Sequence, residues 1–323
     1  MADGTPLTVA KALVLLLALV VVPAVLVAFV AGSIAVSAFP VGLLGGLLLT
    51  KGEGRRLAPQ FTAALPIAAA VSSLTAGTWW WVALFAVLGA VAGALSSAGR
   101  ALPMVQVSLI AATAPQIRTL GGLLVYVAFL VLGAMFGTLL ARRAGAPADT
   151  VPHPAAPLPV ASTALFGATV FAVGAAISVA VGGDHSFWYL VMVLVLLQLV
   201  IVDARSGRVA AAQRVVGTFV GVLAAVPLAA VLPAGLNVAV AIVLVAVGIS
   251  QPPQRYWLAS AAISAAVLVV SAPDGDSLAL GTRRVLATVL AFVLLAVALG
   301  GLHRTRGWRS AFQAGSESRS RTA

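Results

Sequence analysis

Apolar residues fill long runs of this chain, and short polar or Gly/Pro-rich breaks separate one run from the next. Most runs contain ~17–23 residues, the length that an α-helix needs to cross a bilayer. The pattern therefore predicts an all-α chain that crosses a membrane about twelve times. The predicted spans are 10–31, 34–50, 58–76, 79–97, 101–115, 119–141, 161–182, 186–202, 212–232, 235–250, 255–272 and 283–302.

Two of these spans need separate treatment. The first has a lysine at its start and small residues after it, as a cleavable signal would, but its apolar run at 13–30 is longer than a signal core. We interpret it as a retained first helix. The span at 101–115 is short and contains Pro103 and Pro115, so we expect a tilted, broken or re-entrant helix there.

Composition places the chain among membrane proteins. Of its 323 residues, 62% are hydrophobic and 8% are charged, and the mean hydropathy is +1.13. These values leave too little polar surface to cover a water-soluble domain. The net charge of +11 fits the positive-inside rule and contact with anionic lipids. Membrane lipids rather than nucleic acid are therefore the expected partners.

Several kinds of chemistry are not expected. The chain has no cysteine, which excludes disulfides, thiolate metal sites and cysteine nucleophiles. Its three histidines, His153, His185 and His303, lie far apart in predicted loops. The sequence has neither a cluster of aspartates nor a His-Glu-x-x-His motif. We therefore expect no enzyme activity, no metal site and no cofactor.

The distribution of charge sets the orientation of the spans. If both termini lie in the cytoplasm, 16 of the 19 lysines and arginines fall on the inner side. The outer side then holds only Arg118, Arg283 and Arg284. Because cytoplasmic loops are enriched in basic residues, we expect a multi-pass protein of the cytoplasmic membrane with both termini inside.

A Pro/Ala-rich stretch divides the chain into two halves of six spans each. The predicted units are a first repeat at 1–143, a cytoplasmic linker at 144–160, a second repeat at 161–303 and a basic disordered tail at 304–323. In each half, the second span ends in a basic turn and arginine begins the sixth span. Because six is an even number, the two repeats are expected to be parallel.

One motif combines a cation with two glycines four positions apart. Arg214 begins an apolar run, and Gly217, Thr218 and Gly221 follow it. We interpret Arg214 as an anchor at the lipid headgroups and the glycines as a place where another helix approaches closely. A functional hinge is the alternative for this glycine pair. Three further pairs share its spacing and its predicted packing role: Gly42/Gly46, Gly89/Gly93 and Gly133/Gly137.

This motif belongs to a wider pattern in the second half of the chain. Its elements are Trp188-Tyr189, Leu197-Gln198, Arg205 to Arg208, Arg214-x-x-Gly217-Thr218-x-x-Gly221, Tyr256-Trp257 and Arg283-Arg284. The pattern resembles the fusaric-acid-resistance-like, or aromatic acid exporter, superfamily. The resemblance is close over 160–303 and weaker over 10–143.

The resemblance implies a membrane protein that exports aromatic carboxylates and related small organic compounds. Several members of the superfamily pair with a periplasmic adaptor protein, and many carry a large soluble domain between their halves. This chain has only the short linker at 145–159 in that place, which puts an adaptor partner in doubt. A homo-oligomer is compatible with the sequence.

Few polar side chains are predicted at membrane depth, and none of them is an acid, a lysine or a histidine. Proton-driven transporters usually place a titratable group there, so facilitated or weakly coupled transport is an option. Gln106 and Gln198 are among the neutral polar residues. An unpaired amide is costly in hydrocarbon, so Gln198 should face the bundle interior. There it bonds either a substrate carboxylate or another helix.

Arg118, Arg283 and Arg284 depart from the positive-inside pattern and lie at matching places in the two halves. An arginine fork binds a carboxylate well, so an outer anion site is one interpretation. In the other interpretation, Asp274 and Asp276 neutralise the arginine pair, and Arg118 extends to the headgroups.

Five tryptophans lie at the ends of predicted spans: Trp79, Trp80, Trp81, Trp188 and Trp257. Tryptophan is enriched at the boundary between membrane and water. We expect these residues to be interfacial anchors rather than stacking groups for a substrate.

Two functions follow from these observations. The first is a permease that exports small aromatic or amphiphilic organic acids across the cytoplasmic membrane, and its candidate pathway residues are Gln198, Gln106, Arg118, Arg283 and Arg284. The second is a non-transporting membrane scaffold or assembly partner. The packing glycines and the absence of charge at mid-membrane depth favour this second function.

Overall fold

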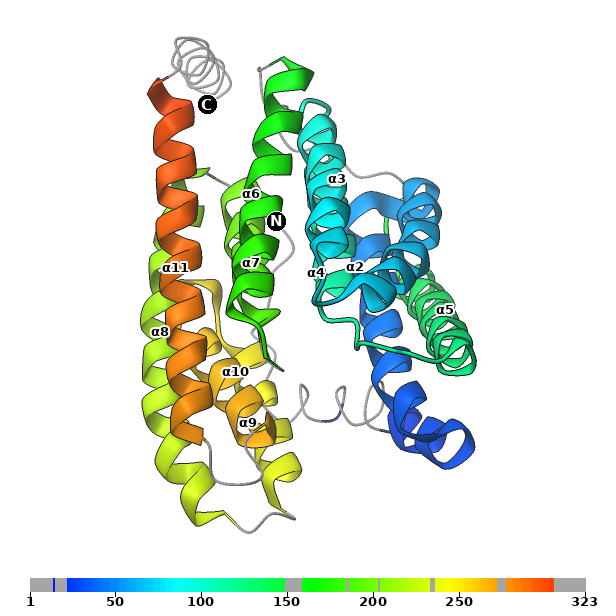
Figure 1. The fold of residues 1–323 in the computed structure, drawn as a ribbon. Coiled ribbons are helices and arrows are strands. Elements are labelled where there is room, and N and C mark those ends of the chain that lie inside the picture. Colours follow the sequence, from blue (N-terminus) through cyan, green and yellow to red (C-terminus); the bar gives the residue numbers. More distant parts are fainter. Residues whose placement is uncertain are drawn as a thin grey trace.

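The structure is a computed structural model that describes residues 14, 22–148, 159–183, 186–202, 204–232, 236–271 and 277–304. These residues form helices and turns, with no strand among them (Figure 1). The helices are α2 (Val22–Thr75), α3 (Trp79–Ser96), α4 (Ala101–Ala112), α5 (Leu120–Arg143), α6 (Val160–Val181), α7 (Trp188–Val202), α8 (Ala204–Val231), α9 (Asn237–Ser250), η3 (Pro253–Arg255), α10 (Tyr256–Ser271) and α11 (Ser277–Arg304). Most of the predicted linker, the tail after residue 304 and the first half of the first predicted span lie outside the described residues.

Helix α2 includes two predicted spans and the basic turn between them. Its hydrogen-bond pattern is helical throughout, but the chain reverses direction within it (Figure 1). A Cβ atom placed on Gly45 would lie 2.7 Å from Cδ1 of Leu65, whereas twenty residues of straight helix would separate them by ~30 Å. Gly54, between the two apolar halves of α2, has a φ of 78°, a conformation that glycine adopts readily. The predicted basic turn is therefore present.

Two of the predicted glycine pairs pack against each other across α2 and α5. Gly42 and Gly46 on α2 face the backbone of α5, and Gly133 and Gly137 on α5 face the backbone of α2. A methyl group at any of the four positions would overlap a carbonyl oxygen of the other helix. Small residues at this spacing let two helices approach until their backbones touch. The packing role predicted for both pairs is confirmed.

The third glycine pair joins the two halves of the chain. Gly89 and Gly93 on α3 pack against α6, where the carbonyl oxygens of Gly167 and Thr163 occupy the space that a Cβ atom would need. Helix α3 precedes the predicted linker and α6 follows it. The close contact between them therefore brings the N-terminal and C-terminal halves together.

Two short helices, α4 and α7, contact each other in the middle of the bundle (Figure 1). Most of the side chains of α4 are buried, and α7 contributes a run of buried leucines, valines and methionine to the core. Helix α4 has 12 residues, so it rises only ~18 Å. That length falls well short of the ~30 Å hydrocarbon core of a bilayer. The segment at 101–115 is therefore not an ordinary span, in line with the sequence-based expectation.

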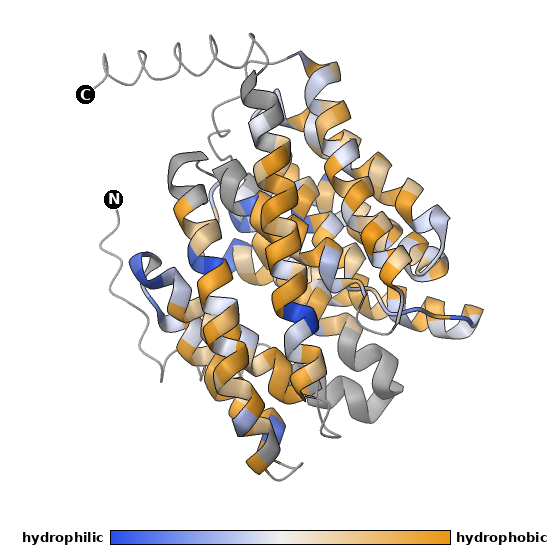
Figure 2. Cartoon of the chain, turned by 60° about the vertical axis from the view of Figure 1, so that its left-hand side comes forward, coloured by the Kyte–Doolittle hydropathy of each residue, from blue (hydrophilic) through white to orange (hydrophobic). Residues whose placement is uncertain are grey.

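Six described helical segments are long and apolar enough to cross a membrane: Arg56–Thr75, Trp79–Ser96, Leu120–Arg143, Val160–Val181, Val209–Ala229 and Leu278–Ala298. Five shorter apolar helical segments accompany them in the described part of the chain. Large apolar side chains such as Leu124, Phe136 and Leu223 remain exposed on these helices. Figure 2 shows that most residues along these helices are hydrophobic. Such a surface suits contact with lipid rather than with water.

The expected arrangement of twelve spans as two matching repeats is not confirmed. In the first half, the closest glycine contact joins α2 to α5, which correspond to the second and sixth predicted spans. In the second half, the comparable contact joins α8 to α10, which correspond to the third and fifth. The two halves therefore use the same packing device between different helices.

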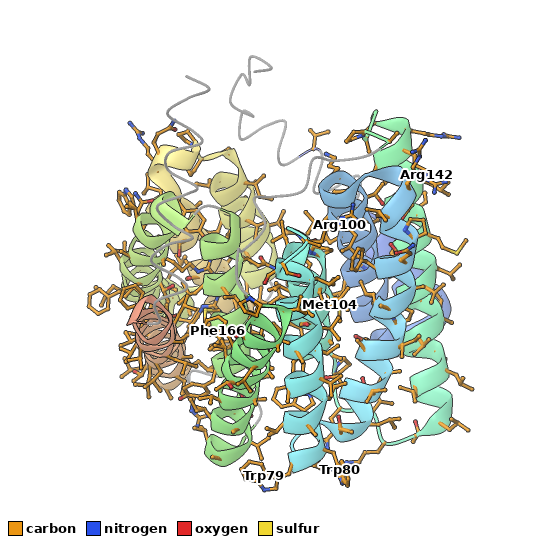
Figure 3. All side chains as sticks on the ribbon, turned by 90° about the horizontal axis from the view of Figure 1, so that it is seen from above. Trp79, Trp80, Arg100, Met104, Arg142 and Phe166 are labelled. Atoms are coloured by element: carbon orange, nitrogen blue, oxygen red, sulfur yellow. The ribbon has the colours of Figure 1, made fainter. Side chains whose placement is uncertain are left out.

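The two ends of the first-half helices differ in chemistry. Figure 3 shows Trp79 and Trp80 at one end, and Arg100 and Arg142 at the opposite end. Trp79 is 66% exposed and Trp80 is 75% exposed. Exposed tryptophans at one end and arginines at the other are typical of the two boundaries of a membrane protein.

Trp81 differs from its two neighbours, and the prediction that it is an interfacial anchor is wrong. Its side chain is buried, and its Nε1–H donates to Oγ of Ser72 at 2.8 Å. Its ring meets Phe85 edge to face, with 4.8 Å between the ring centroids. Successive residues of a helix point about 100° apart, so a run of three tryptophans at a helix start places them on different faces.

Candidate functional site

The Arg-x-x-Gly-Thr-x-x-Gly motif of α8 packs against the start of α10. A Cβ atom at Gly217 would overlap the carbonyl oxygen of Trp257, and one at Gly221 would overlap that of Ala261. The two backbones therefore touch over one full turn of each helix. Helix α10 is the helix that approaches this glycine pair.

Polar side chains line the same interface, because residues four positions apart share a helix face. Ser260 donates its hydroxyl to the carbonyl oxygen of Arg214 at 3.2 Å. One turn further along both helices, the hydroxyls of Ser264 and Thr218 lie 3.5 Å apart. Thr218 is buried and so are both serines. These contacts fix the rotation of α8 relative to α10 and hence the direction in which Arg214 points.

Arg214 lies inside the protein. Its side chain is only 7% exposed, and Nη1 donates to the hydroxyl of Tyr256 at 3.4 Å. Its Nε atom is buried without a hydrogen-bond partner. The prediction that Arg214 anchors α8 at the lipid headgroups is therefore wrong. The physical reason is the glycine contact, which brings α10 and Tyr256 over the position that lipid was expected to occupy.

Arg284 on α11 is the second buried cation. Its side chain is 4% exposed, and its guanidinium carbon lies 4.8 Å from the centroid of the Trp188 ring. This is a cation–π contact, in which the negative face of an indole attracts a guanidinium. The Nε atom of Arg284 is also buried without a hydrogen-bond partner.

Trp188 begins α7 and is 4% exposed. The prediction that it is an interfacial anchor is therefore wrong. Helix α7 packs against α8 and α11, so its first residue faces protein rather than headgroups. In this position the indole ring holds Arg284 rather than anchoring the helix to the membrane.

The two buried arginines lie on helices that pack against each other, α8 and α11. All eight acidic residues of the chain lie outside the residues whose side chains the structure describes. Asp274 and Asp276, which the alternative interpretation pairs with Arg283 and Arg284, are among them. We refer to Arg214, Arg284, Trp188 and Tyr256 as the arginine cluster.

The structure separates the other predicted site residues from this cluster. Arg283 and Arg118 are exposed, and no hydrogen bond or ion pair between described residues joins either of them to Arg284. Arg283 points toward the turn after α6, where its Nη1 lies 3.9 Å from a Cβ atom placed on Gly183. The proposed outer group of three arginines therefore divides into one buried residue and two exposed ones.

The two glutamines lie on the central short helices. Gln198 on α7 is partly buried, and its Nε2 atom is buried without a partner. Gln106 on α4 is partly buried. Among the described residues, no hydrogen bond to another helix holds the buried amide nitrogen of Gln198.

Trp188 and Tyr256 are the functional candidates whose roles the sequence did not indicate. Both appear in the resemblance pattern, in which each opens a span. An aromatic residue at the start of a span usually indicates a membrane boundary. Only the packing of four helices shows that these two side chains contact buried arginines instead.

The fold and the arginine cluster together define a multi-pass helical membrane protein with cationic groups buried inside it. Within this class, residues 170–298 match the family model described as fusaric acid resistance protein-like. The matched region contains every residue of the arginine cluster. The resemblance inferred for the second half is therefore confirmed. No curated protein and no solved structure matches the chain.

Proposed function

We propose that this protein is a permease that exports small aromatic or amphiphilic organic acids across the cytoplasmic membrane. The observation that carries the proposal is the pair of buried arginines, Arg214 and Arg284, each with an unpaired Nε atom. Charged side chains within membrane segments are costly, and they generally mark the route of a substrate or ion. A guanidinium is well suited to a carboxylate because its N–H groups form a planar fork.

The family supports the same function. Its name refers to resistance against an organic acid, and export is a direct way to produce such resistance. The matched residues include α7, α8, α10 and most of α11, the four helices that supply the arginine cluster. The proposed substrate class therefore agrees with both the family and the chemistry of the buried side chains.

The proposal includes an orientation. The end of the first-half bundle that carries Arg100 and Arg142 faces the cytoplasm, and the end that carries Trp79 and Trp80 faces outward (Figure 3). The proposed orientation places both termini in the cytoplasm. Because the chain has no cysteine, single cysteines can be introduced without background. A cysteine in place of Arg142 should react with impermeant maleimide only in inside-out vesicles. If it reacts from the outside of intact cells, the proposed orientation is wrong.

The function is tested by transport in proteoliposomes. Liposomes that contain the purified protein and are preloaded with radiolabelled benzoate should release it faster than protein-free liposomes do. Arg284→Gln should lower that release rate about 100-fold, because the substituted site leaves a bound carboxylate without its partner. Arg100→Gln is the matched control, because Arg100 lies in the turn between α3 and α4, at the bundle end away from Trp79 and Trp80. Equal loss in both variants would contradict the assigned role of Arg284.

A non-transporting scaffold is the second candidate function. The backbone-to-backbone glycine contacts between α2 and α5 and between α3 and α6 favour it, because such contacts make a rigid body. The same liposome experiment separates the two functions. A scaffold gives no release of benzoate or of any other organic acid above that from empty liposomes.

A further inference from the structure

The two buried arginines lie on different helix pairs. Arg214 belongs to α8, which the glycine contact ties to α10. Arg284 belongs to α11, and its guanidinium is held by Trp188 of α7. Helices α8 and α11 pack against each other, so the two cations share one interior region.

Each guanidinium contacts one aromatic side chain, and the Nε atom of each makes no hydrogen bond. Arg214 uses Nη1 for Tyr256, and Arg284 presents its flat face to Trp188. In both residues the Nε atom is buried and has no partner. An Nε–H and the neighbouring Nη–H form the side of the guanidinium that takes both oxygens of a carboxylate. The cluster therefore offers two carboxylate-binding edges.

We propose that Arg214 and Arg284 together bind a single organic acid that carries two carboxylates, one on each guanidinium. The inference rests on the proposed export function, and it defines the substrate class of the same site more narrowly. The bound acid connects the α8–α10 pair to the α7–α11 pair, so it stabilises their contact as well as occupying the site.

Charge favours an acid with two carboxylates over an acid with one. Arg214 and Arg284 are buried on helices that pack together, and a Cβ atom placed on Gly281, about one turn from Arg284, would lie 2.6 Å from Val222 of α8. Two buried cations on contacting helices repel each other, and a ligand with one negative charge pairs with only one of them. An uncompensated buried charge is strongly unfavourable, whereas a charge that is paired and hydrogen-bonded is tolerated. A ligand with two carboxylates neutralises both arginines and fills both free edges.

The first experiment measures binding with ligands that differ only in their carboxylates. The probes are benzoate and the three benzenedicarboxylates (phthalate, isophthalate and terephthalate), titrated into the purified protein in lipid nanodiscs. At least one dicarboxylate should bind about tenfold or more tightly than benzoate, as expected for one added charge-assisted hydrogen-bonded pair. The best isomer reports the distance between the two guanidinium groups. Equal affinity for all four ligands would overturn the inference.

Tryptophan fluorescence provides a local readout of the same titration. An anion that binds Arg284 changes the field at the Trp188 ring, which lies 4.8 Å away. The fluorescence change should disappear in Trp188→Phe and persist in Trp257→Phe, because the Trp257 side chain is 36% exposed whereas that of Trp188 is buried. A change that survives in Trp188→Phe would place the ligand elsewhere.

The second experiment is a double-mutant cycle on the preferred dicarboxylate. Arg214→Gln and Arg284→Gln should each weaken binding about tenfold, to about the affinity of benzoate for the wild type, and the double variant should bind more weakly still. In either single variant, the preference for the dicarboxylate over benzoate should vanish. If that preference persists in both single variants, one ligand does not bridge the two arginines. The lysine variants at the same positions serve as folding controls, because they keep the charge.

The outcomes separate this inference from the proposed function. If benzoate and the dicarboxylates are transported equally, and the single variants show no change of preference, the proposed export function stands and the two-carboxylate site is ruled out. If a dicarboxylate binds both arginines but no organic acid is transported, the two-carboxylate site stands and the proposed export function is ruled out. Asp274→Asn and Asp276→Asn, at the acids that the alternative interpretation pairs with Arg283 and Arg284, complete the test: if either raises the affinity for benzoate to that of the best dicarboxylate, an acidic side chain rather than a ligand neutralises the cluster.

Discussion

Pairs of glycines bring two helices together both at the α2–α5 interface of the first half and at the α8–α10 interface of the second half. The side chains around the two contacts differ. In both, glycines four positions apart bring two helix backbones into contact. The α2–α5 contact is surrounded by small and apolar residues, with Thr50 and Thr138 as a polar pair 3.3 Å apart. The α8–α10 contact carries Arg214, Tyr256 and Ser260 on its edge.

This difference shows what a glycine pair does and does not determine. The glycines set how closely two helices approach, and they do so equally in both halves. The residues on either side decide whether the contact is only structural or also positions a charged group. In the second half, close approach places a phenol beside an arginine and removes that arginine from lipid.

The largest expected effect concerns the glycine contacts themselves. Gly46→Leu and Gly221→Leu should both abolish the yield of folded protein, because a leucine has no space between the backbones and overpacking alone costs about 1–3 kcal/mol or more. The measurement is the monodisperse fraction on size-exclusion chromatography in mild detergent. Gly121→Leu on α5 is the matched control, because nothing lies within 4 Å of a Cβ atom there. If Gly121→Leu also lowers the monodisperse fraction, the loss of folded protein does not depend on contact between helices.

A smaller effect should distinguish the two interfaces by function. Tyr256→Phe removes the acceptor of the Arg214 Nη1 hydrogen bond, which is worth about 1 kcal/mol, or about fivefold in binding. We expect benzoate flux to fall by that factor while the folded yield stays unchanged. In the first half, Phe39→Leu at the α2–α5 contact should leave flux unchanged. A loss of flux in Phe39→Leu as large as that in Tyr256→Phe would mean that both interfaces serve transport directly.

The smallest effect should be equal in the two halves. Thr138→Ala and Ser264→Ala each remove one side of a long hydroxyl–hydroxyl contact, at 3.3 and 3.5 Å. Hydrogen bonds between membrane helices contribute about 0.6 kcal/mol on average, so each variant should lower the free energy of unfolding by no more than that. Thermal unfolding in detergent gives the comparison. A much larger loss for Ser264→Ala would show that the α8–α10 hydroxyls do more than pack.

Part of the fold could be predicted from the sequence because lipid imposes simple rules. The length of the apolar runs predicted helices close to those observed, and the spacing of Gly42, Gly46, Gly133 and Gly137 predicted close packing. The pairing of these glycines could not be predicted. Their two segments lie about ninety residues apart in the chain, and any small-residue pair can in principle pack with any other.

The candidate site was harder to predict, for reasons that Arg283 and Arg284 illustrate. Neighbouring residues on a helix point about 100° apart, so one of two adjacent arginines can be buried while the other is exposed. The sequence shows that both are cations but not which one α7 will cover. Arg214 likewise stands near the start of an apolar run, where a headgroup anchor is the ordinary expectation. Its burial depends on Tyr256 and α10, which follow forty residues later.

The most direct measurement of the central claim is calorimetric titration of benzoate into the purified protein in nanodiscs, with and without Arg284. The wild-type protein should bind benzoate with one site per chain, and Arg284→Gln should weaken that binding about tenfold or more while thermal unfolding confirms that the variant is folded. Unchanged affinity in folded Arg284→Gln would show that the buried arginines stabilise the bundle without binding an acid.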